Sequence, residues 1–473
     1  MNREELYEER EQTEYISDLR AWNDAYEREH GTRRRAFVVT FGCQQNEADS
    51  EKLRGLALAF GYTLAECVEE ADLILVNTCA IREHAEQKAL STIGQYKHLK
   101  AKNPALLIGV CGCMVTQEHR VDDIKFRYPY VDFVFGTSSI HRLPQILCAR
   151  LEKSRRIYAP EEAESLVKEG LPIERESSYR AWVSIMYGCN NFCSYCIVPY
   201  VRGRERSRAS DAVYEEVREL VDKGYKDITL LGQNVNSYGK ELAENCDFAK
   251  LLKRLASIEG DYRLHFMTSH PKDATRELID VMAENVHIAN HFHLPLQSGS
   301  DRILKSMNRH YDRARYLDVV GYMREKMPDI AITTDIIVGF PGETEEDFEA
   351  TLDMLRLVKF DMIYSFIYSP RKGTPAAEME DQVPSDVQKA RFERLLALQH
   401  EISLGKNLPF VNRTVQVLCD GVSKTNEALY SGRTEEGKIV FFEGEECDKG
   451  NFVKINIERA EAFALYGKKQ KRG

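Results

Sequence analysis

Apolar and polar positions alternate along the first third of the chain in a strand-and-helix pattern. Three short apolar runs are typical of strands that are buried on both faces of a parallel sheet: residues 36–41, 73–77 and 105–110. Helical periods lie between these runs, at residues 49–60 and 83–100. This alternation predicts an α/β fold that begins with a small doubly wound α/β domain over residues 34–151.

A second alternation covers residues 179–404. Its candidate strands are residues 182–186, 227–231, 263–268, 291–296, 332–338 and 362–368. Its candidate helices are residues 211–223, 248–258, 274–284, 314–326 and 345–357. Thr344 and Asp347 have the spacing of a capping box at the start of the last helix. Six strand–helix units in one run predict a partial (β/α)6 barrel, with its chemistry at the carboxyl ends of the strands.

The remaining segments have patterns of their own. Short strand-like runs separated by Gly, Asp and Asn predict a small β-barrel over residues 405–470, and a basic tail follows at residues 468–472. Residues 1–33 are charged and predict a partly helical extension without a core of its own. Residues 152–178 lose the apolar period and predict a linker.

Composition narrows the class of protein. With 43% hydrophobic residues, the 473-residue chain can fill the cores of two or three domains. The sequence contains no apolar run of about 18 residues, and its first ten residues are rich in Glu and Arg, so we expect neither a membrane span nor a secretory signal. A net charge of −10 disfavours non-specific coating of nucleic acid but allows a local basic groove. We therefore expect a soluble cytoplasmic protein.

Three cysteines follow the first strand of the predicted barrel in the sequence GCNNFCSYC. Cys189, Cys193 and Cys196 are close enough to bind one metal centre. A zinc site completed by a distant fourth ligand is the alternative to an iron–sulfur cluster with one open iron. The C-x3-C-x2-C pattern resembles the signature of the radical S-adenosylmethionine superfamily, and Tyr195 matches the aromatic residue usual in that motif. This resemblance implies a [4Fe–4S] cluster that binds S-adenosylmethionine and cleaves it to a 5′-deoxyadenosyl radical.

Other motifs at the strand ends of the barrel fit contacts to the cofactor. Gly232, Gln233 and Asn234 end the second strand, where the superfamily usually holds the amino group of the cofactor. The further candidates are Gln297, Asp335 and Gly339. Glycines also occur in turns of this kind for purely structural reasons, so the alternative is that these residues only shape the turns.

A second set of cysteines lies in the N-terminal domain. Cys43, Cys79 and Cys113 each follow one of the three predicted strands. The carboxyl ends of parallel strands meet at one edge of the sheet, which predicts a second site with three thiolates. Cys111 is an alternative to Cys113, although it continues the buried strand, and isolated cysteines are often only small buried hydrophobic residues.

The order of these parts resembles the methylthiotransferase family over about residues 35–470. The stretches LLGQNVNSYG, TSHP and LPLQSGSDRILKSMNR look like the MiaB type of that family. The resemblance implies an auxiliary [4Fe–4S] cluster on the first cysteine set and an RNA-binding TRAM domain at the C-terminus. It also implies methylthiolation of N6-(dimethylallyl)adenosine at position 37 of tRNA, with S-adenosylmethionine supplying both the methyl group and the radical.

Two other functions remain open. One is a methylthiotransferase that acts on threonylcarbamoyladenosine in tRNA or on a ribosomal protein. The other is a non-catalytic iron–sulfur or RNA-binding protein, which the presence of two complete cysteine sets disfavours. The sequence identifies no catalytic side chain, electron donor or sulfur donor, and we expect a monomer whose partner is tRNA.

Basic residues after the barrel cysteines are candidates for RNA contact. They alternate along PYVRGRERSR as Arg202, Arg204, Arg206 and Arg208. An extended segment would place several of them on one face, at the predicted mouth of the barrel. The alternative is a solvated charged loop.

Overall fold

A computed structural model describes residues 11–81, 83–153, 155–159 and 167–470 of the chain. The chain divides into two compact units. The first consists of the chain up to Glu176 together with Tyr187–Cys189 and Ile197–Arg206. The second consists of Ser177–Met186, Asn190–Cys196 and the chain from Ser207 onwards. In the described part of the chain, no helix is both long and apolar enough to cross a membrane.

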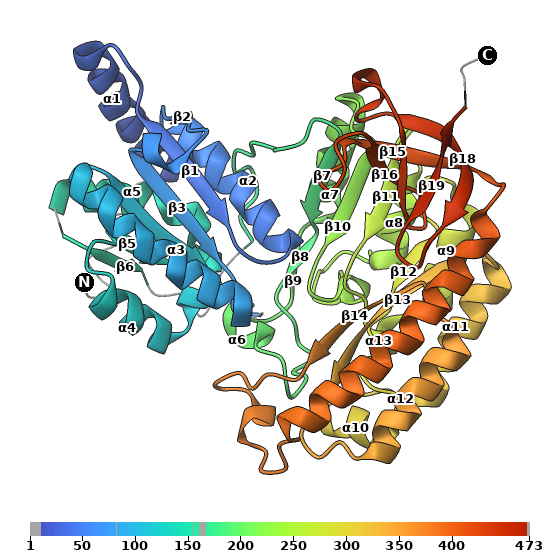
Figure 1. Cartoon of the computed structure of the whole chain (residues 1–473). Helices are drawn as coiled ribbons and strands as arrows, with labels where there is room; N and C mark the ends of the chain where they lie inside the picture. The colour runs from blue at the N-terminus through green and yellow to red at the C-terminus, as the bar shows by residue number, and fades with distance from the viewer. Residues whose placement is uncertain (1–10, 82, 154, 160–166, 471–473) are drawn as a thin grey trace. The chain divides into compact units, whose positions relative to one another are not determined.

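The first unit contains a parallel sheet, drawn in blue to teal in Figure 1. Among the described residues the strand order is β2 (Thr63–Leu64), β1 (Arg35–Thr40), β3 (Leu73–Thr78), β4 (Leu107–Gly112), β5 (Phe133–Phe135) and β6 (Ile157–Ala159). Every residue of β3 and β4 is buried. Along β3, Leu73 and Leu75 enter one hydrophobic core while Ile74 and Val76 enter another, as the alternation of a strand requires.

Helices cover both faces of this sheet. Side chains of α1 (Gln12–His30), α2 (Gln44–Ala59) and α5 (Leu143–Lys153) fill the core on one face. Those of α3 (Glu83–Lys102) and α4 (Glu118–Arg127) fill the core on the other. The predicted doubly wound α/β domain is therefore confirmed.

Two segments of the first unit are more ordered than the sequence pattern predicted. The extension at residues 1–33 contains α1, and Tyr15 and Leu19 of α1 are buried in the core beside α5. The predicted linker at residues 152–178 contains β6, and its Arg175 forms an ion pair with Glu51 of α2 (Nη1–Oε2 3.0 Å). The apolar patterns of these two elements are weak in the sequence, because β6 has three residues and α1 buries only a narrow stripe of side chains.

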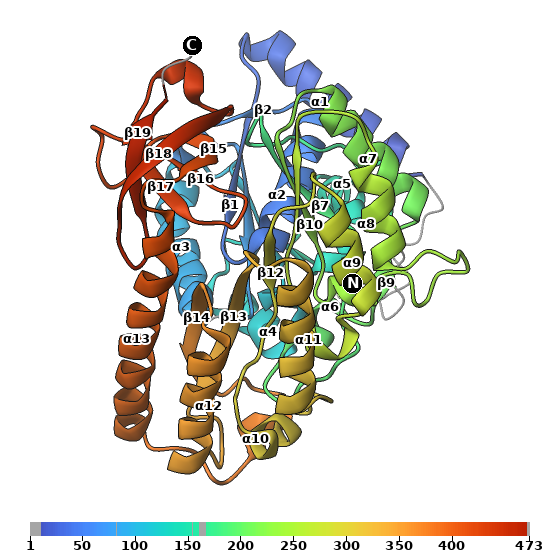
Figure 2. The same ribbon diagram turned by 90° about the vertical axis from the view of Figure 1, so that its right-hand side faces the viewer.

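The second unit begins with parallel strands that follow one another in chain order. Among the described residues these strands form two sheets. One contains β7 (Arg180–Ser184), β10 (Asp227–Leu231) and β11 (Arg263–Phe266), and the other contains β12 (His291–His293), β13 (Ala331–Val338) and β14 (Met362–Ile367). The helices are α7 (Ser210–Asp222), α8 (Phe248–Ala256), α9 (Arg276–Glu284), α10 (Asp301–Ser306), α11 (Arg313–Lys326), α12 (Glu345–Val358) and α13 (Ser385–Asn407). Figure 2 shows these strands with α11, α12 and α13 packed outside β13 and β14. This arrangement is the predicted partial barrel.

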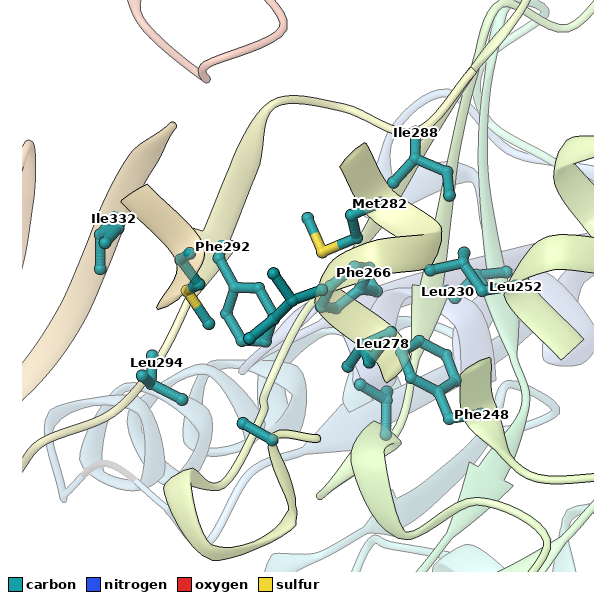
Figure 3. Packing of buried hydrophobic residues seen from close by; sticks show 14 of the residues in the cluster. Leu230, Phe248, Leu252, Phe266, Leu278, Met282, Ile288, Phe292, Leu294 and Ile332 are labelled. Carbon is teal, nitrogen blue, oxygen red and sulfur yellow. The ribbon is translucent and has the colours of Figure 1, made fainter. Parts of the chain in front are cut away.

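A core of interlocking aromatic and aliphatic side chains holds the strands and helices of this unit together. Figure 3 shows Phe248 of α8, Phe266 of β11 and Phe292 of β12 within it. Phe266 contacts Phe248 and Phe292 edge to face, each with a centroid distance of 5.2 Å. The Thr344–Asp347 capping box is present at the start of α12, as predicted.

A closed β-barrel forms the C-terminal end of the second unit. Its strands within the described residues are β15 (Thr414–Val422), β16 (Tyr430–Arg433), β17 (Ile439–Glu443), β18 (Phe452–Ala460) and β19 (Leu465–Lys469). The small β-barrel predicted from the sequence is thus confirmed, and β19 includes Lys468 and Lys469 of the expected basic tail.

This β-barrel packs against the amino ends of the parallel strands. Asp420 of β15 pairs with Arg180, the first residue of β7 (Oδ1–Nη2 2.8 Å). Lys438 pairs with Asp361, which directly precedes β14 (Nζ–Oδ1 2.9 Å). The carboxyl ends of the strands, where chemistry is expected, therefore lie on the side away from this β-barrel.

Candidate functional site

The first cysteine set lies beyond the carboxyl ends of three adjacent strands, β1, β3 and β4. Cys43 is half-buried at the start of α2, while Cys79 and Cys113 are buried. The Sγ of Cys43 donates to Asn46 Oδ1 at 3.4 Å, and the backbone N–H of Ile81 donates to Cys79 Sγ at 3.3 Å. The sheet topology thus brings together the three residues that the sequence predicted.

Two glycines allow the three cysteines to approach one another. Gly42 has φ +134°, and a Cβ there would lie 2.8 Å from Cys79 Cβ. Gly112 has φ +99°, and a Cβ there would lie 2.3 Å from the carbonyl oxygen of Thr78. Any side chain at either position would push the neighbouring strand ends apart.

The chemistry of this cluster suits metal binding. Burial, together with the nearby Cys79 and Cys43 thiols, raises the pKa of Cys113 to about 12, although Arg202 acts in the opposite direction. A buried thiol that resists ionisation in this way is ionised when a metal replaces its proton. Cys111, the alternative ligand, belongs to β4 and contributes to the hydrophobic core among Leu107 and Phe133.

The second cysteine set lies on the loop between β8 (Met186–Tyr187) and α6 (Val198–Arg202). Cys193 and Cys196 belong to the second unit, and the backbone N–H of Cys196 donates to the carbonyl of Cys193 at 2.9 Å. Cys189 precedes Cys193 by four residues and is grouped with the first unit. Chain connectivity keeps its Cα within about 14 Å of Cys193.

No three His, Cys, Asp or Glu side chains of the described residues lie close enough together to hold a single metal ion. Wider spacing is compatible with a [4Fe–4S] cluster, because the thiolates of such a cluster each bind a different iron and stand further apart.

The strand ends of the second unit carry a group of buried polar atoms that lack hydrogen-bond partners among the described residues. They follow β10 and β11 and are Gln233 Oε1, Asn234 Oδ1, both amide atoms of Asn236, Ser269 Oγ and His270 Nε2. Asn234 also donates to Asp273 Oδ2 at 2.8 Å, which fixes its amide. Such atoms are costly to bury alone, so the group fits a polar ligand such as the cofactor predicted here.

The other predicted cofactor contacts lie around β12 and β13. Gln297 has φ +69°, and its N–H donates to the carbonyl of Asp335 at 2.8 Å. Asp335 Oδ2 lies 3.6 Å from His293 Nε2. Gly339 has φ +75°, and its N–H donates to Glu343 Oε2 at 2.8 Å.

Two predicted cofactor contacts have close protein neighbours. Tyr195 packs against a small hydrophobic cluster that includes Met307 and Phe340. A Cβ at Gly232 would lie 2.5 Å from Met186 Cγ, so a larger residue there would require Met186 to move.

The sequence pattern was misleading for Arg202. Its side chain is buried and pairs with Asp49 (Nη2–Oδ2 2.9 Å). Burial lowers the pKa of Arg202, but Cys113, Asp49 and Cys43 outweigh that effect and raise it. Arg202 therefore faces the first cysteine set, and the prediction that it contacts RNA is wrong for this structure. The reason is that α6 is helical, whereas the prediction assumed an extended segment.

The other three arginines of this segment differ in exposure. Arg208 donates to the Ser184 carbonyl at 2.9 Å and to Glu216 Oε2 at 2.6 Å. Arg206 is half-buried and donates to the Arg202 carbonyl at 2.8 Å. Arg204 is exposed. Arg204 is thus the strongest remaining candidate of the four for RNA contact.

Sequence reasoning missed two buried residues beside the predicted cysteines and cofactor contacts. His270 Nδ1 accepts the Lys272 N–H at 3.3 Å, which leaves Nε2 to carry the proton. Burial and the nearby Arg309 lower the pKa of His270, so its ring is neutral. Arg309 Nη1 donates to Cys193 Sγ at 3.3 Å. The only available signal was their position in the stretches TSHP and LPLQSGSDRILKSMNR.

Comparison with known proteins agrees with this fold. Residues 183–355 match the Radical SAM superfamily, residues 35–136 match a family described as uncharacterized protein family UPF0004, and residues 410–469 match the TRAM domain. A solved structure of the radical S-adenosylmethionine methyltransferase TsrM from Kitasatospora setae, with cobalamin and a [4Fe-4S] cluster bound, is 15% identical. It covers 73% of this chain and 77% of its own with a TM-score of 0.53, which is a likeness of fold.

Curated relatives match nearly the whole chain. A protein of Clostridium botulinum is 50% identical over 431 residues, which are 91% of this chain and 96% of the relative. One of Acetivibrio thermocellus is 47% identical over 456 residues, which are 96% of this chain and 95% of the relative. Both are named tRNA-2-methylthio-N(6)-dimethylallyladenosine synthase. The chain therefore belongs to the tRNA-2-methylthio-N(6)-dimethylallyladenosine synthase family, within the radical S-adenosylmethionine superfamily.

Proposed function

We propose that the protein attaches a methylthio group to N6-(dimethylallyl)adenosine at position 37 of tRNA. The observation that carries the proposal is the pair of three-cysteine sets, each beyond the carboxyl ends of parallel strands, in a chain half identical to synthases named for this reaction. Residues 34–151 would bear the auxiliary cluster, residues 179–404 the radical chemistry and residues 405–470 contacts to RNA.

The two cysteine sets would each hold one [4Fe–4S] cluster. Cys43, Cys79 and Cys113 would bind the auxiliary cluster, and Cys189, Cys193 and Cys196 the radical cluster. Three thiolates leave one iron of each cluster open to a further ligand. When bound, the radical cluster and S-adenosylmethionine would supply an electron and a radical able to break the unreactive C2–H bond of adenine.

The side chains of the barrel would bind and orient the cofactor. Asn234, whose amide is fixed by Asp273, presents a buried oxygen to the amino group of the ligand. His270 in its neutral form presents a buried N–H donor that does not titrate near pH 7. Gln233 adds a further acceptor, and Gly232 keeps the strand end close to Met186. Together these groups replace water around the cofactor.

Other residues would complete the site. We propose that Gln297, Asp335 and Gly339 contact the cofactor from β12 and β13, and that Tyr195 packs beside it. Arg204 would contact the RNA backbone near the unstacked base, in addition to the TRAM domain. One chain carries both cysteine sets, so we propose a monomer that works in the cytoplasm, where thiols stay reduced.

The test is a product assay with the full-length protein. Anaerobically reconstituted protein is incubated with S-adenosylmethionine, a one-electron reductant and tRNA that contains N6-(dimethylallyl)adenosine. The nucleosides are then analysed by mass spectrometry. We expect the 2-methylthio product with the natural protein and with the control Cys148→Ala, whose thiol donates to a backbone carbonyl of α1. Cys79→Ala and Cys189→Ala should each abolish product.

Other outcomes would change the assignment. Cleavage of S-adenosylmethionine without any methylthio product would keep the radical chemistry and reject this substrate. A product from tRNA that carries threonylcarbamoyladenosine would point to the alternative substrate. Full activity in Cys79→Ala would reject the auxiliary cluster.

A further inference from the structure

Arg309 is a buried arginine whose guanidinium contacts the cysteine loop of the second unit. Its side chain donates to Cys193 Sγ (3.3 Å), Tyr195 Oη (3.4 Å), Tyr311 Oη (3.1 Å) and the carbonyl of Pro295 (2.9 Å). The residue is 4% exposed. Of these acceptors, Cys193 is a predicted cluster ligand and Tyr195 is the aromatic residue of the same cysteine motif.

The charge of Arg309 has no carboxylate partner among the described residues. Two other buried arginines do have one: Arg391 pairs with Glu343 at 3.0 Å and Arg202 with Asp49 at 2.9 Å. A guanidinium cannot lose its proton in a protein, and an unpaired buried charge is strongly unfavourable. Among the side chains that Arg309 contacts, Cys193 is the one that becomes an anion when it binds metal.

The backbone around Arg309 is held in an unusual conformation. Asn308 and His310, on either side of it, have φ +58° and +57°. A positive φ is uncommon for residues other than glycine, and such conformations persist where surrounding contacts fix them. Those contacts lead to the cysteine loop, because Asn308 Nδ2 donates to the Phe192 carbonyl at 2.9 Å and the Ser194 N–H donates to the Met307 carbonyl at 3.0 Å.

We propose that Arg309 is a positioning residue that supplies the buried counter-charge of the radical cluster and raises its reduction potential through the N–H···Sγ hydrogen bond to Cys193. The inference deepens the proposed function and rests on its assignment of Cys193 as a ligand. Reduction adds one electron, and therefore one negative charge, beside a fixed cation. The cation and its hydrogen bond stabilise the reduced cluster more than the oxidised cluster, which raises the potential.

The test is a redox titration of the reconstituted full-length protein, followed by electron paramagnetic resonance. The signal that is missing from Cys193→Ala protein identifies the radical cluster. In Arg309→Gln this signal should appear at a more negative potential, while the auxiliary signal stays where it is. Arg309→Lys keeps the charge but not the branched set of donors. Its midpoint potential should fall between that of the natural protein and that of Arg309→Gln.

The matched control is Arg180→Gln, which removes an arginine at the amino end of β7. Arg180 has its own carboxylates, Asp227 at 3.0 Å and Asp420 at 2.8 Å, so its loss should leave the potential of the radical cluster unchanged. A midpoint in Arg309→Gln equal to that of the natural protein, or an equal shift in the control, would overturn the inference. If Arg309→Gln takes up no cluster, the Arg309→Lys midpoint gives the answer: a negative shift supports the role and no shift contradicts it. Absence of any such signal from the natural protein would instead reject the proposed function.

Discussion

At the scale of single residues, Gly112 determines where Cys113 can lie. Its φ of +99° and the 2.3 Å that would separate a Cβ from the Thr78 carbonyl exclude a side chain without movement of β3 and β4. We predict that Gly112→Ala lowers the free energy of unfolding by about 1–3 kcal/mol. It should also lower the amount of iron bound to the first cysteine set. Chemical denaturation and iron analysis measure the two effects.

The control for this prediction is Gly94→Ala in the same unit. Gly94 lies within α3, and a Cβ there would stand 3.8 Å from Tyr128, an ordinary contact. Alanine in a helix should stabilise the protein by up to about 1 kcal/mol and leave bound iron unchanged. Equal iron content in Gly112→Ala and the natural protein would show that strand spacing does not control the site.

The candidate site was only partly visible in single residues of the sequence. The spacing of Cys189, Cys193 and Cys196 predicts a shared metal centre without any knowledge of the fold. Arg309 and Arg202 could not be interpreted in the same way, since nothing in a one-dimensional pattern says that a charged residue is buried. Arg202 was assigned to RNA for that reason, and the structure pairs it with Asp49 instead.

At the scale of elements, α1 is part of the first unit. Leu19 of α1 is 1% exposed within the core that α2 and α5 share. We predict that Leu19→Ala lowers the free energy of unfolding by about 2–4 kcal/mol, because it removes buried apolar surface and leaves a cavity. Arg28→Ala, an exposed position of the same helix, should change it by less than about 0.5 kcal/mol. If both substitutions changed the free energy of unfolding by similar, small amounts, α1 would not be needed for the stability of the first unit.

Elements with a strong apolar period were predictable, whereas α13 was not, although it has 23 residues. Strands such as β10 and helices such as α12 lie within one residue of the ranges predicted from the sequence. β6 has three residues, and β19 ends within the charged tail, so tertiary pairing rather than local pattern defines them. The sequence also missed α10, whose six residues are too few to show a helical period.

At the scale of the whole second unit, the TRAM β-barrel and the candidate site occupy opposite ends of the parallel strands. The β-barrel contacts Arg180 and Asp361 at the amino ends, while the unpartnered polar atoms follow the carboxyl ends of β10 and β11. The eight residues of β13 span about 26 Å. RNA that contacts both ends of this unit must therefore extend along its length, as a folded tRNA can.

The central claim is that two separate cysteine sets hold two [4Fe–4S] clusters, and counting iron in the reconstituted full-length protein tests it most directly. We predict about eight iron atoms per chain in the natural protein and in Cys148→Ala, and about four in each of two triple variants. One variant replaces Cys43, Cys79 and Cys113 with alanine, and the other replaces Cys189, Cys193 and Cys196. About eight iron atoms in either triple variant would contradict the claim, as would about four in the natural protein.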